Sequence, residues 1–252
     1  VDRSWEAVSE DVFGGDISNI AFAASDKQIV YVSRFNRLFK SLDGGITFEE
    51  IDFAFTNNIS SIEINHQNSD VIYISSGGNS EGVFTNVAQF GQNWKVYKSE
   101  DGGGNWTDIT LNLPIEPQFV IKHQDQSPLN DLYLGTSVGV YHINDNMAEW
   151  EVFDLKLPNV PVVDLSINTE EATITAGTYG RGVWQSPIEV VKADTDISLI
   201  AINSNNTIQF EGLNPVIQVK NNGLNAFNAV DINYYVDDIL YTYTYNGSIN
   251  PG

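Results

Sequence analysis

The stretch VYKSEDGGGNW at residues 96–106 decides the fold, because it recurs twice more along the chain. A gap-free alignment places beside it LFKSLDGGITF at residues 38–48 and VYHINDNMAEW at residues 140–150. The start of a further strand follows each copy, and the aromatic residue that ends each copy is matched near the start of the chain by Trp5. Trp5, Phe48, Trp106 and Trp150 are 43, 58 and 44 residues apart, and the long interval contains an insertion at about residues 77–93. Without the insertion, the repeat is about 43 residues long.

Two other strand patterns recur upstream of each copy. The first lies at residues 17–25, 59–66, 119–123 and 162–168, and the second at 29–33, 71–75, 131–135 and 172–177. Alternating apolar residues and β-branched side chains predict half-buried strands, and no segment shows a helical period. Four short strands repeated at this spacing are typical of a β-propeller. The sequence therefore predicts an all-β fold, with about four four-stranded blades of a partial propeller in residues 1–191.

The fourth unit reaches only its third strand, in GTYGRGVWQSPIEV at residues 177–190. Two sources for its last strand remain open. One is a distant part of the chain, upstream of Val1, and the other is the segment IEVV at residues 188–191.

The turns SLDGGITF and SEDGGGNW resemble the Asp-box (BNR) motif of sialidases, sortilin-type propellers and xyloglucanases, over the range from Trp5 to about Pro187. We expect Asp43 and Asp101 to accept hydrogen bonds from turn N–H groups. The glycines supply positive φ angles, and the final aromatics pack between blades. The third copy has Ile143 in place of the serine, so we expect a looser turn. The structural residues of the three turns are Ser41, Asp43, Gly44, Gly45, Phe48, Ser99, Asp101, Gly102, Gly103, Trp106, Asp145 and Trp150.

A second domain is predicted at residues 192–252. Strand patterns at 195–205, 214–223 and 229–245 are separated by Asn- and Gly-rich turns. The string VIQVKNNGLNAFNAVDINYYVDD resembles a CARDB-type module, an immunoglobulin-like domain linked to bacterial cell adhesion. The resemblance implies a β-sandwich of which this chain holds the N-terminal part, so we expect the chain to be a truncated piece.

Composition excludes several functions. The net charge is −21 with only 12 Lys and Arg residues, so the surface repels nucleic acid, and no apolar run is long enough for membrane insertion. The chain has no Cys, which rules out disulfides and thiolate metal sites. His66 and His123 end equivalent strands without the spacing typical of metal ligands. We therefore predict no metal and no cofactor.

The predicted binding face consists of the loops between second and third strands and the connections between blades. Arg34, Arg37 and Arg181 lie near this face, and arginine can hold a carboxylate through two hydrogen bonds. Tyr179 lies close to Arg181, as a sialidase nucleophile would, but the sialidase-type FRIP motif is absent, and Arg181 can instead stabilise the last blade. The predicted ligand-binding residues are Arg34, Phe84, Phe90, Trp94, Tyr179 and Arg181, and no catalytic residue is assigned.

The aromatics among these residues come from the insertion and its end, where Asn and Gln accompany them. Aromatic rings stack on sugars and amides bond hydroxyl groups, so this segment is suited to a glycan or peptide, although its aromatics can also be packing residues.

The resemblance implies a secreted or cell-surface binding protein of a Bacteroidetes-type bacterium, engaged in adhesion. Its expected partners are a glycan or a surface protein, together with the type IX secretion machinery if the full-length protein carries a sorting domain. The alternative is a glycoside hydrolase of the sialidase or xyloglucanase type, with catalytic residues partly upstream. Asp11, Asp16 and Glu116 are the carboxylates suitably placed for it, and nothing in the sequence selects a pair.

Overall fold

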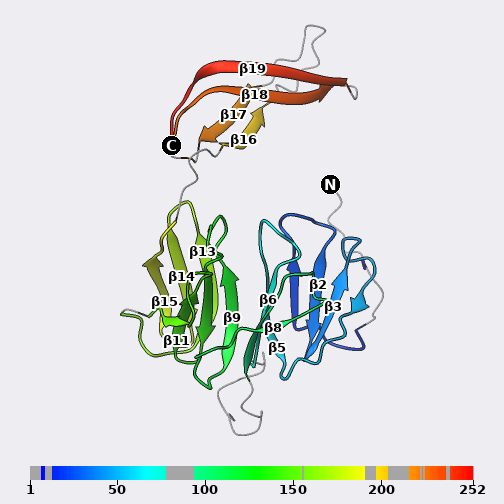
Figure 1. The fold of residues 1–252 in the computed structure, drawn as a ribbon, viewed down its shortest axis with the longest axis vertical. Helices are drawn as coiled ribbons and strands as arrows, with labels where there is room; N and C mark the ends of the chain where they lie inside the picture. Colours follow the sequence, from blue (N-terminus) through cyan, green and yellow to red (C-terminus); the bar gives the residue numbers. More distant parts are fainter. Residues whose placement is uncertain are drawn as a thin grey trace. The chain divides into compact units, whose positions relative to one another are not determined.

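Strands form every regular element that is described in the computed structural model (Figure 1). The structure describes residues 7–8, 13–77, 94–154, 156–190, 197–203, 216–221, 223, 225–236 and 239–251. The chain divides into two compact units, Val1–Val190 and Val191–Gly252. Within the described residues, no helix is long and apolar enough to cross a membrane. The prediction of an all-β fold is confirmed.

The described strands of the first unit form four antiparallel sheets, arranged in chain order. The first sheet contains β1 (Asn19–Phe22), β2 (Val30–Arg34), β3 (Arg37–Ser41) and β4 (Glu49–Glu50). The second contains β5 (Ile59–Ile64), β6 (Ile72–Ser76), β7 (Lys95–Ser99) and β8 (Thr107–Asp108). The third contains β9 (Gln118–His123), β10 (Leu132–Thr136), β11 (Gly139–Ile143) and β12 (Glu151–Val152). The fourth contains β13 (Val162–Asn168), β14 (Thr173–Thr178) and β15 (Gly182–Pro187).

Apolar side chains fill the space between neighbouring sheets. The first strands contact one another in succession, β1 with β5, β5 with β9 and β9 with β13. Between the first two sheets, buried Tyr31 and Leu38 meet Ile62 and Ile74. Two similar clusters join the second sheet to the third and the third to the fourth. Burying one such aliphatic side chain contributes about 1.5–3 kcal/mol, so the contacts between sheets hold the unit together.

The aromatic that ends each turn contacts residues earlier in the chain. Trp106, just before β8, lies with its ring centroid 5.2 Å from that of Phe55, which follows the first sheet. Trp150, just before β12, donates a hydrogen bond from Nε1 to Ile109 O at 2.8 Å. Phe48 lies 5.0 Å from Phe13, which precedes β1. Each of the first three sheets is thereby fastened to the segment before it, whereas Trp5 lies outside the described residues.

The two end sheets expose surfaces that the inner sheets bury. Ile20 and Phe22 on β1 are both 59% exposed, whereas Ile62 and Ile64, at the same register positions on β5, are 6% and 4% exposed. At the other end, Val183 on β15 is 75% exposed. Its counterparts Leu38, Val96 and Val140 are almost fully buried. The described sheets therefore form an array that is open at both ends.

The fourth sheet shows that one proposed source of its last strand is wrong. Residues 188–190 form no strand. Ile188 N donates to Ala172 O at 2.9 Å, and the Ile188 side chain is buried with Leu165 and Ile174. Ile188 thus continues the pairing of β15 with β14 instead of turning back along the outer edge of β15, while Val191 lies outside the described residues.

The described strands of the second unit form two antiparallel pairs, here called hairpins. β16 (Ile197–Asn203) pairs with β17 (Val216–Asn221), and β18 (Phe227–Val236) pairs with β19 (Ile239–Ile249). The buried Asn221 side chain joins the hairpins, because its Nδ2 donates to Ile249 O at 2.9 Å and its Oδ1 accepts from Gly223 N at 3.0 Å. The prediction of one strand over residues 229–245 is wrong, since Val236 pairs with Ile239. Alternation continues on both sides of this break, so periodicity did not reveal it.

Candidate functional site

Two turns are held by a serine and an aspartate that act together. Ser41 Oγ accepts a hydrogen bond from Gly45 N and donates one to Asp43 Oδ1, at 2.9 and 2.7 Å. The same Asp43 oxygen accepts from Ile46 N and Thr47 N, and Oδ2 accepts from Thr47 Oγ1 at 2.6 Å. The hydrogen bonds from Thr47 and Ser41 lower the Asp43 pKa from 3.8 to about 2. The ionised carboxylate is therefore the form that this turn stabilises.

The second turn repeats this arrangement. Asp101 accepts from Asn105 Nδ2 at 2.6 Å and from Asn105 N at 2.8 Å, and these bonds lower its pKa to about 2. Ser99 Oγ accepts from Gly103 N at 2.9 Å. Gly102 and Gly103 have φ angles of 69° and 98°, which side chains other than glycine rarely adopt. Both carboxylates therefore accept hydrogen bonds from groups of their own turns.

The third turn has different hydrogen bonds from the other two. Asp145 Oδ2 accepts a hydrogen bond from Asn130 Nδ2 at 2.6 Å, so its carboxylate bonds the loop between β9 and β10. Within the turn, Asn144 Oδ1 accepts from Asn146 N and Asn144 O accepts from Met147 N. No residue from 144 to 150 has a positive φ angle. Where the serine is absent, the aspartate therefore bonds a neighbouring loop.

Trp94 is not presented to a ligand, and that prediction is wrong. The Trp94 side chain is only 5% exposed. Its ring covers Gly77, where a Cβ atom would lie 1.7 Å from Trp94 Cδ1. Trp94 is thus a packing residue at the base of the insertion. Phe84 and Phe90 lie outside the described residues.

Arg34 is half-buried, and its side chain contacts neighbouring residues. Its guanidinium lies against Gly15, where an added Cβ atom would be 2.7 Å from Nη2. It also lies 5.1 Å from the centre of the Phe35 ring. Arg37, its neighbour on β3, forms a two-point ion pair with Glu50, with N–O distances of 2.6 and 2.5 Å. Arg37 thus contacts its own sheet, and Arg34 contacts residues next to that sheet.

The turn between β14 and β15 exposes two of the predicted ligand-binding side chains to solvent. Tyr179 is 63% exposed, and Arg181 is exposed as well. Thr178 Oγ1 donates to Gly182 O at 2.6 Å, and Trp184 Nε1 donates to Arg181 O at 3.0 Å. Gly180 and Gly182 have φ angles of 80° and 77°. The backbone of this turn is therefore fixed before any ligand arrives.

The candidate carboxylates of a hydrolase lie on different sheets. Asp16 precedes β1, whereas Glu116 precedes β9 and accepts a hydrogen bond from Ser137 Oγ at 2.7 Å. Asp11 lies outside the described residues.

His66 and His123 belong to a polar network between the second and third sheets. Their ring centroids lie 6.1 Å apart. His123 Nε2 lies 3.2 Å from Asn65 Nδ2, and burial lowers the His123 pKa. The buried Glu63 pairs with Lys122 at 2.9 Å and lies 3.8 Å from His66. Among the described residues, no group of three or more side chains is arranged to hold a metal ion.

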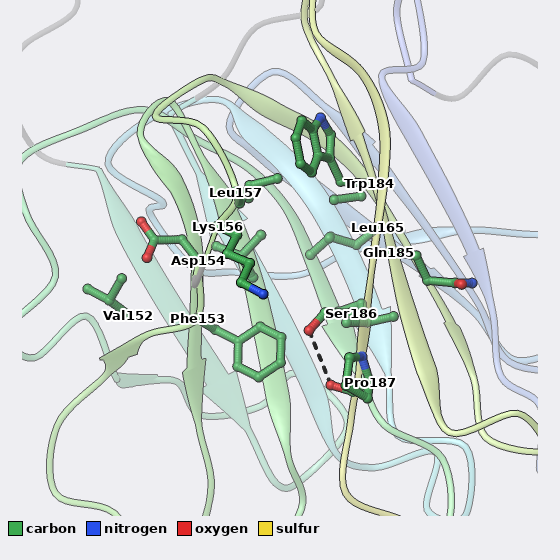
Figure 2. A pocket seen from close by; sticks show the side chains of 13 residues that line it. Val152, Phe153, Asp154, Lys156, Leu157, Leu165, Trp184, Gln185, Ser186 and Pro187 are labelled. Carbon is green, nitrogen blue, oxygen red and sulfur yellow. Dashed lines mark hydrogen bonds between the residues drawn. The ribbon is translucent and has the colours of Figure 1, made fainter.

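A largely apolar pocket lies between the third and fourth sheets. Its volume is about 580 Å³. Figure 2 shows Phe153 and Leu157 on the side of the third sheet, facing Trp184 and Pro187 of β15. Buried Leu165 lies between them, and Asp154 and Lys156 are the charged residues of the lining. The sequence analysis did not predict this pocket. The feature that could have predicted it is the lack of a fourth strand in the last unit.

Searches with the sequence give no match, either among family models or among curated proteins. Solved structures are similar in fold. An ancestral GH74 enzyme matches with a TM-score of 0.53 and 14% identity, over 81% of this chain and 24% of that one. The GH74 enzyme of Niastella koreensis matches with a TM-score of 0.50 and 14% identity, over 68% and 28%. YCF48 bound to a D1 peptide matches with a TM-score of 0.46 and 16% identity, over 71% and 49%.

This chain spans between a quarter and a half of the length of those proteins. At such low identity the similarity shows the fold alone. The repeated antiparallel sheets agree with the fold of the two GH74 enzymes, so the first unit has a β-propeller fold and its sheets are blades.

Proposed function

We propose that this chain is part of a secreted or cell-surface adhesion protein whose propeller binds a glycan or protein ligand without transforming it. One observation carries the proposal: the turn between β14 and β15 holds Tyr179 and Arg181 exposed on a fixed backbone. Tyrosine and arginine, with tryptophan, are enriched among the residues that contribute most to binding. A preformed turn also loses little conformational entropy when it binds.

The two serine–aspartate turns support the assignment to Asp-box propellers. Their carboxylates bond the turn backbone on the side of the sheets opposite the Tyr179 turn, so they stabilise the blades. The two hairpins of the second unit support a CARDB-like, immunoglobulin-type module. Asp-box propellers combined with such a module suggest export by a Bacteroidetes-type bacterium, with the type IX machinery as partner if a sorting domain is present.

The test is binding of the full chain to a glycan array and to an array of surface proteins. Changing Tyr179 and Arg181 together to Ala should weaken the strongest interaction by about tenfold or more, because hot-spot residues contribute at least about 2 kcal/mol. Leu42→Ala is the matched control, since Leu42 is exposed in the turn between β3 and β4. It should leave the dissociation constant unchanged.

Hydrolysis assays on the same glycans distinguish the alternative function. Cleavage of a polysaccharide that is abolished by Asp16→Asn or Glu116→Gln would replace the binding proposal with a glycoside hydrolase. Unchanged binding by the Tyr179 and Arg181 double variant would also overturn the assignment of this turn as the contact surface.

A further inference from the structure

His123 differs from the residues at the same register position in the other blades. It pairs with Leu132 at the end of β9. The equivalent residues of the other blades are Phe22, Ile64 and Ile167. His123 is only 3% exposed, and among the described residues none forms a hydrogen bond with its Nδ1 atom. Burying a polar atom without a partner is unfavourable, so stability alone does not account for a histidine at this position.

The hydrogen bonds around His123 determine which ring nitrogen carries the proton. Asn65 Oδ1 accepts from Gln67 N and Asn68 N, at 2.9 and 3.1 Å. The Nδ2 side of the Asn65 amide therefore faces His123, and it lies 3.2 Å from Nε2. An N–H group can approach Nε2 this closely only if that nitrogen is an acceptor. The ring is thus neutral, with its proton on Nδ1.

Asn65 cannot turn to accept a second ring proton. Its Nδ2 also donates to Asn130 Oδ1 at 3.1 Å, and Asn130 Nδ2 donates in turn to Asp145 Oδ2 at 2.6 Å. Turning the Asn65 amide would break this chain together with the two bonds to its Oδ1 atom. A proton on His123 Nε2 therefore breaks the hydrogen bond that joins β9 to the loop after β5.

Both blades contribute groups around His123. The Tyr73 ring on β6 lies nearly parallel to the His123 ring, with centroids 6.0 Å apart, and the His66 ring lies 6.1 Å away. The buried Glu63 on β5 accepts from His123 N at 3.2 Å and from Lys122 Nζ at 2.9 Å. These contacts connect the second blade to the third, so the charge of the His123 ring acts directly on the interface between them.

Burial lowers the pKa of His123 below its ordinary value of 6.5. This effect outweighs a hydrogen bond with Asn130 and the carboxylates of Asp125 and Asp131, which favour the charged ring, and His66 adds to the decrease. The unfolded chain therefore takes up this proton more readily than the folded chain. Stability is consequently lost as pH falls below 6.5 towards the folded value.

We propose that His123 is a pH-sensitive switch at the interface between the second and third blades. The neutral ring accepts a hydrogen bond from Asn65 and holds the two blades together. The protonated ring loses this bond, and the contact between the blades loosens. This inference is independent of the proposed ligand function, because it concerns an interface inside the propeller.

The protonation state can be tested on the unaltered chain. Long-range proton–nitrogen NMR spectra of the histidine-labelled protein contain the rings of 3 histidines. Removing His66 or His142 in turn assigns the signals. The His123 ring should carry its proton on Nδ1 and remain mostly neutral at about pH 6.5. A proton on Nε2, or a mostly charged ring at that pH, would overturn the inference.

The effect on stability is tested with His123→Ile, which introduces the residue that the second and fourth blades carry at this position. Between about pH 7.5 and about pH 5.5, the unfolding equilibrium constant of the wild-type chain should rise relative to that of His123→Ile, by up to about tenfold. Ile64→Val is the matched control, because it shrinks the equivalent side chain of the second blade without removing a titrating group. It should show the wild-type pH dependence. The inference fails if His123→Ile shows that dependence too.

Two tryptophans locate the response within the propeller. Trp150 packs at the interface between the second and third blades, and Trp106 packs at the interface between the first and second. In a chain labelled with 5-fluorotryptophan, acidification over the same range should shift the fluorine NMR signal of Trp150 and leave that of Trp106 in place. His123→Ile should abolish the shift. Equal shifts of both signals would indicate a general response to acid and contradict a switch at this interface.

Discussion

At the scale of single residues, Asp43 and Asp101 couple the stability of their turns to pH. Hydrogen bonds from neighbouring groups depress both pKa values from 3.8 to about 2 in the folded protein. A depressed carboxyl pKa adds stability above the unfolded value, and this contribution disappears as pH falls through the folded value. The relevant window therefore runs from about pH 4 down to about pH 2.

We predict that Asp43→Asn reduces the loss of stability across this window, in addition to lowering stability at pH 7. The Asn side chain cannot ionise, so one source of proton uptake on unfolding is removed. Urea unfolding followed by tryptophan fluorescence from pH 5 to pH 2 measures the effect. Ile46→Ala keeps every bond of the turn and should retain the wild-type pH slope. An unchanged slope in Asp43→Asn would contradict the prediction.

Glycine is needed at position 77 for two reasons, its backbone angle and the lack of space for a side chain. It has a φ angle of 125°, and a Cβ atom there would lie 1.7 Å from Trp94 Cδ1. Gly77→Ala should therefore cost more than the roughly 1–2 kcal/mol of the backbone conformation alone. Gly180→Ala is the matched control, because Gly180 has a φ angle of 80° and no atom within 4 Å of an added Cβ. Equal losses in urea midpoint for the two variants would show that Trp94 does not pack on Gly77.

At the scale of strands, one register position sets how closely neighbouring blades approach. Ser33, Ser75, Gly135 and Gly177 occupy this position on the second strands of the four blades. Only small residues occur there. In the third blade, a Cβ atom on Gly135 would lie 2.7 Å from Val162 O on β13. The backbone of the next blade thus limits the size of the side chain.

This position predicts different outcomes for two chemically identical changes. Gly135→Ala should destabilise the protein by about 1–3 kcal/mol, because overpacking displaces β13. Gly177→Ala should cost less, because the nearest atom to its Cβ is Asp164 Cβ, at 3.4 Å. Chemical denaturation of both variants measures the difference. A larger loss in Gly177→Ala would mean that blade spacing does not depend on this contact.

Strands were the most predictable elements, for reasons visible at particular residues. In TITAGT at residues 173–178, alternation and β-branched side chains identify β14, although this unit has no serine–aspartate turn. The repeat also predicted that Asp43 and Asp101 accept hydrogen bonds from turn N–H groups, because these bonds join residues close in sequence. Contacts between blades were harder to predict. Trp94 looked like a ligand-binding aromatic because its sequence neighbours are polar, and nothing local reveals that its ring covers Gly77.

At the scale of the whole molecule, the net charge of −21 opposes compactness. Salt screens repulsion between exposed charges, with a Debye length of about 10 Å at 0.1 M. We predict that the urea midpoint at pH 7 rises when NaCl increases from about 10 mM to about 0.3 M. The increase should vanish near pH 4, since the isoelectric point is about 4.1. A midpoint that falls with salt at pH 7 would show that exposed ion pairs such as Arg37–Glu50 outweigh the repulsion.

The backward contacts of the turn aromatics also bear on how the protein forms during its synthesis. Trp106 packs on Phe53 and Phe55, and Trp150 on Ile109 and Leu113, which all leave the ribosome before the tryptophan that needs them. Each new blade therefore meets a finished docking surface, and blades can assemble one at a time from the N-terminal side. Once the chain as far as β12 has emerged from the ribosome, its first three blades can already be fastened together. The fourth blade emerges last, so its vacant edge is the last surface of the array to form.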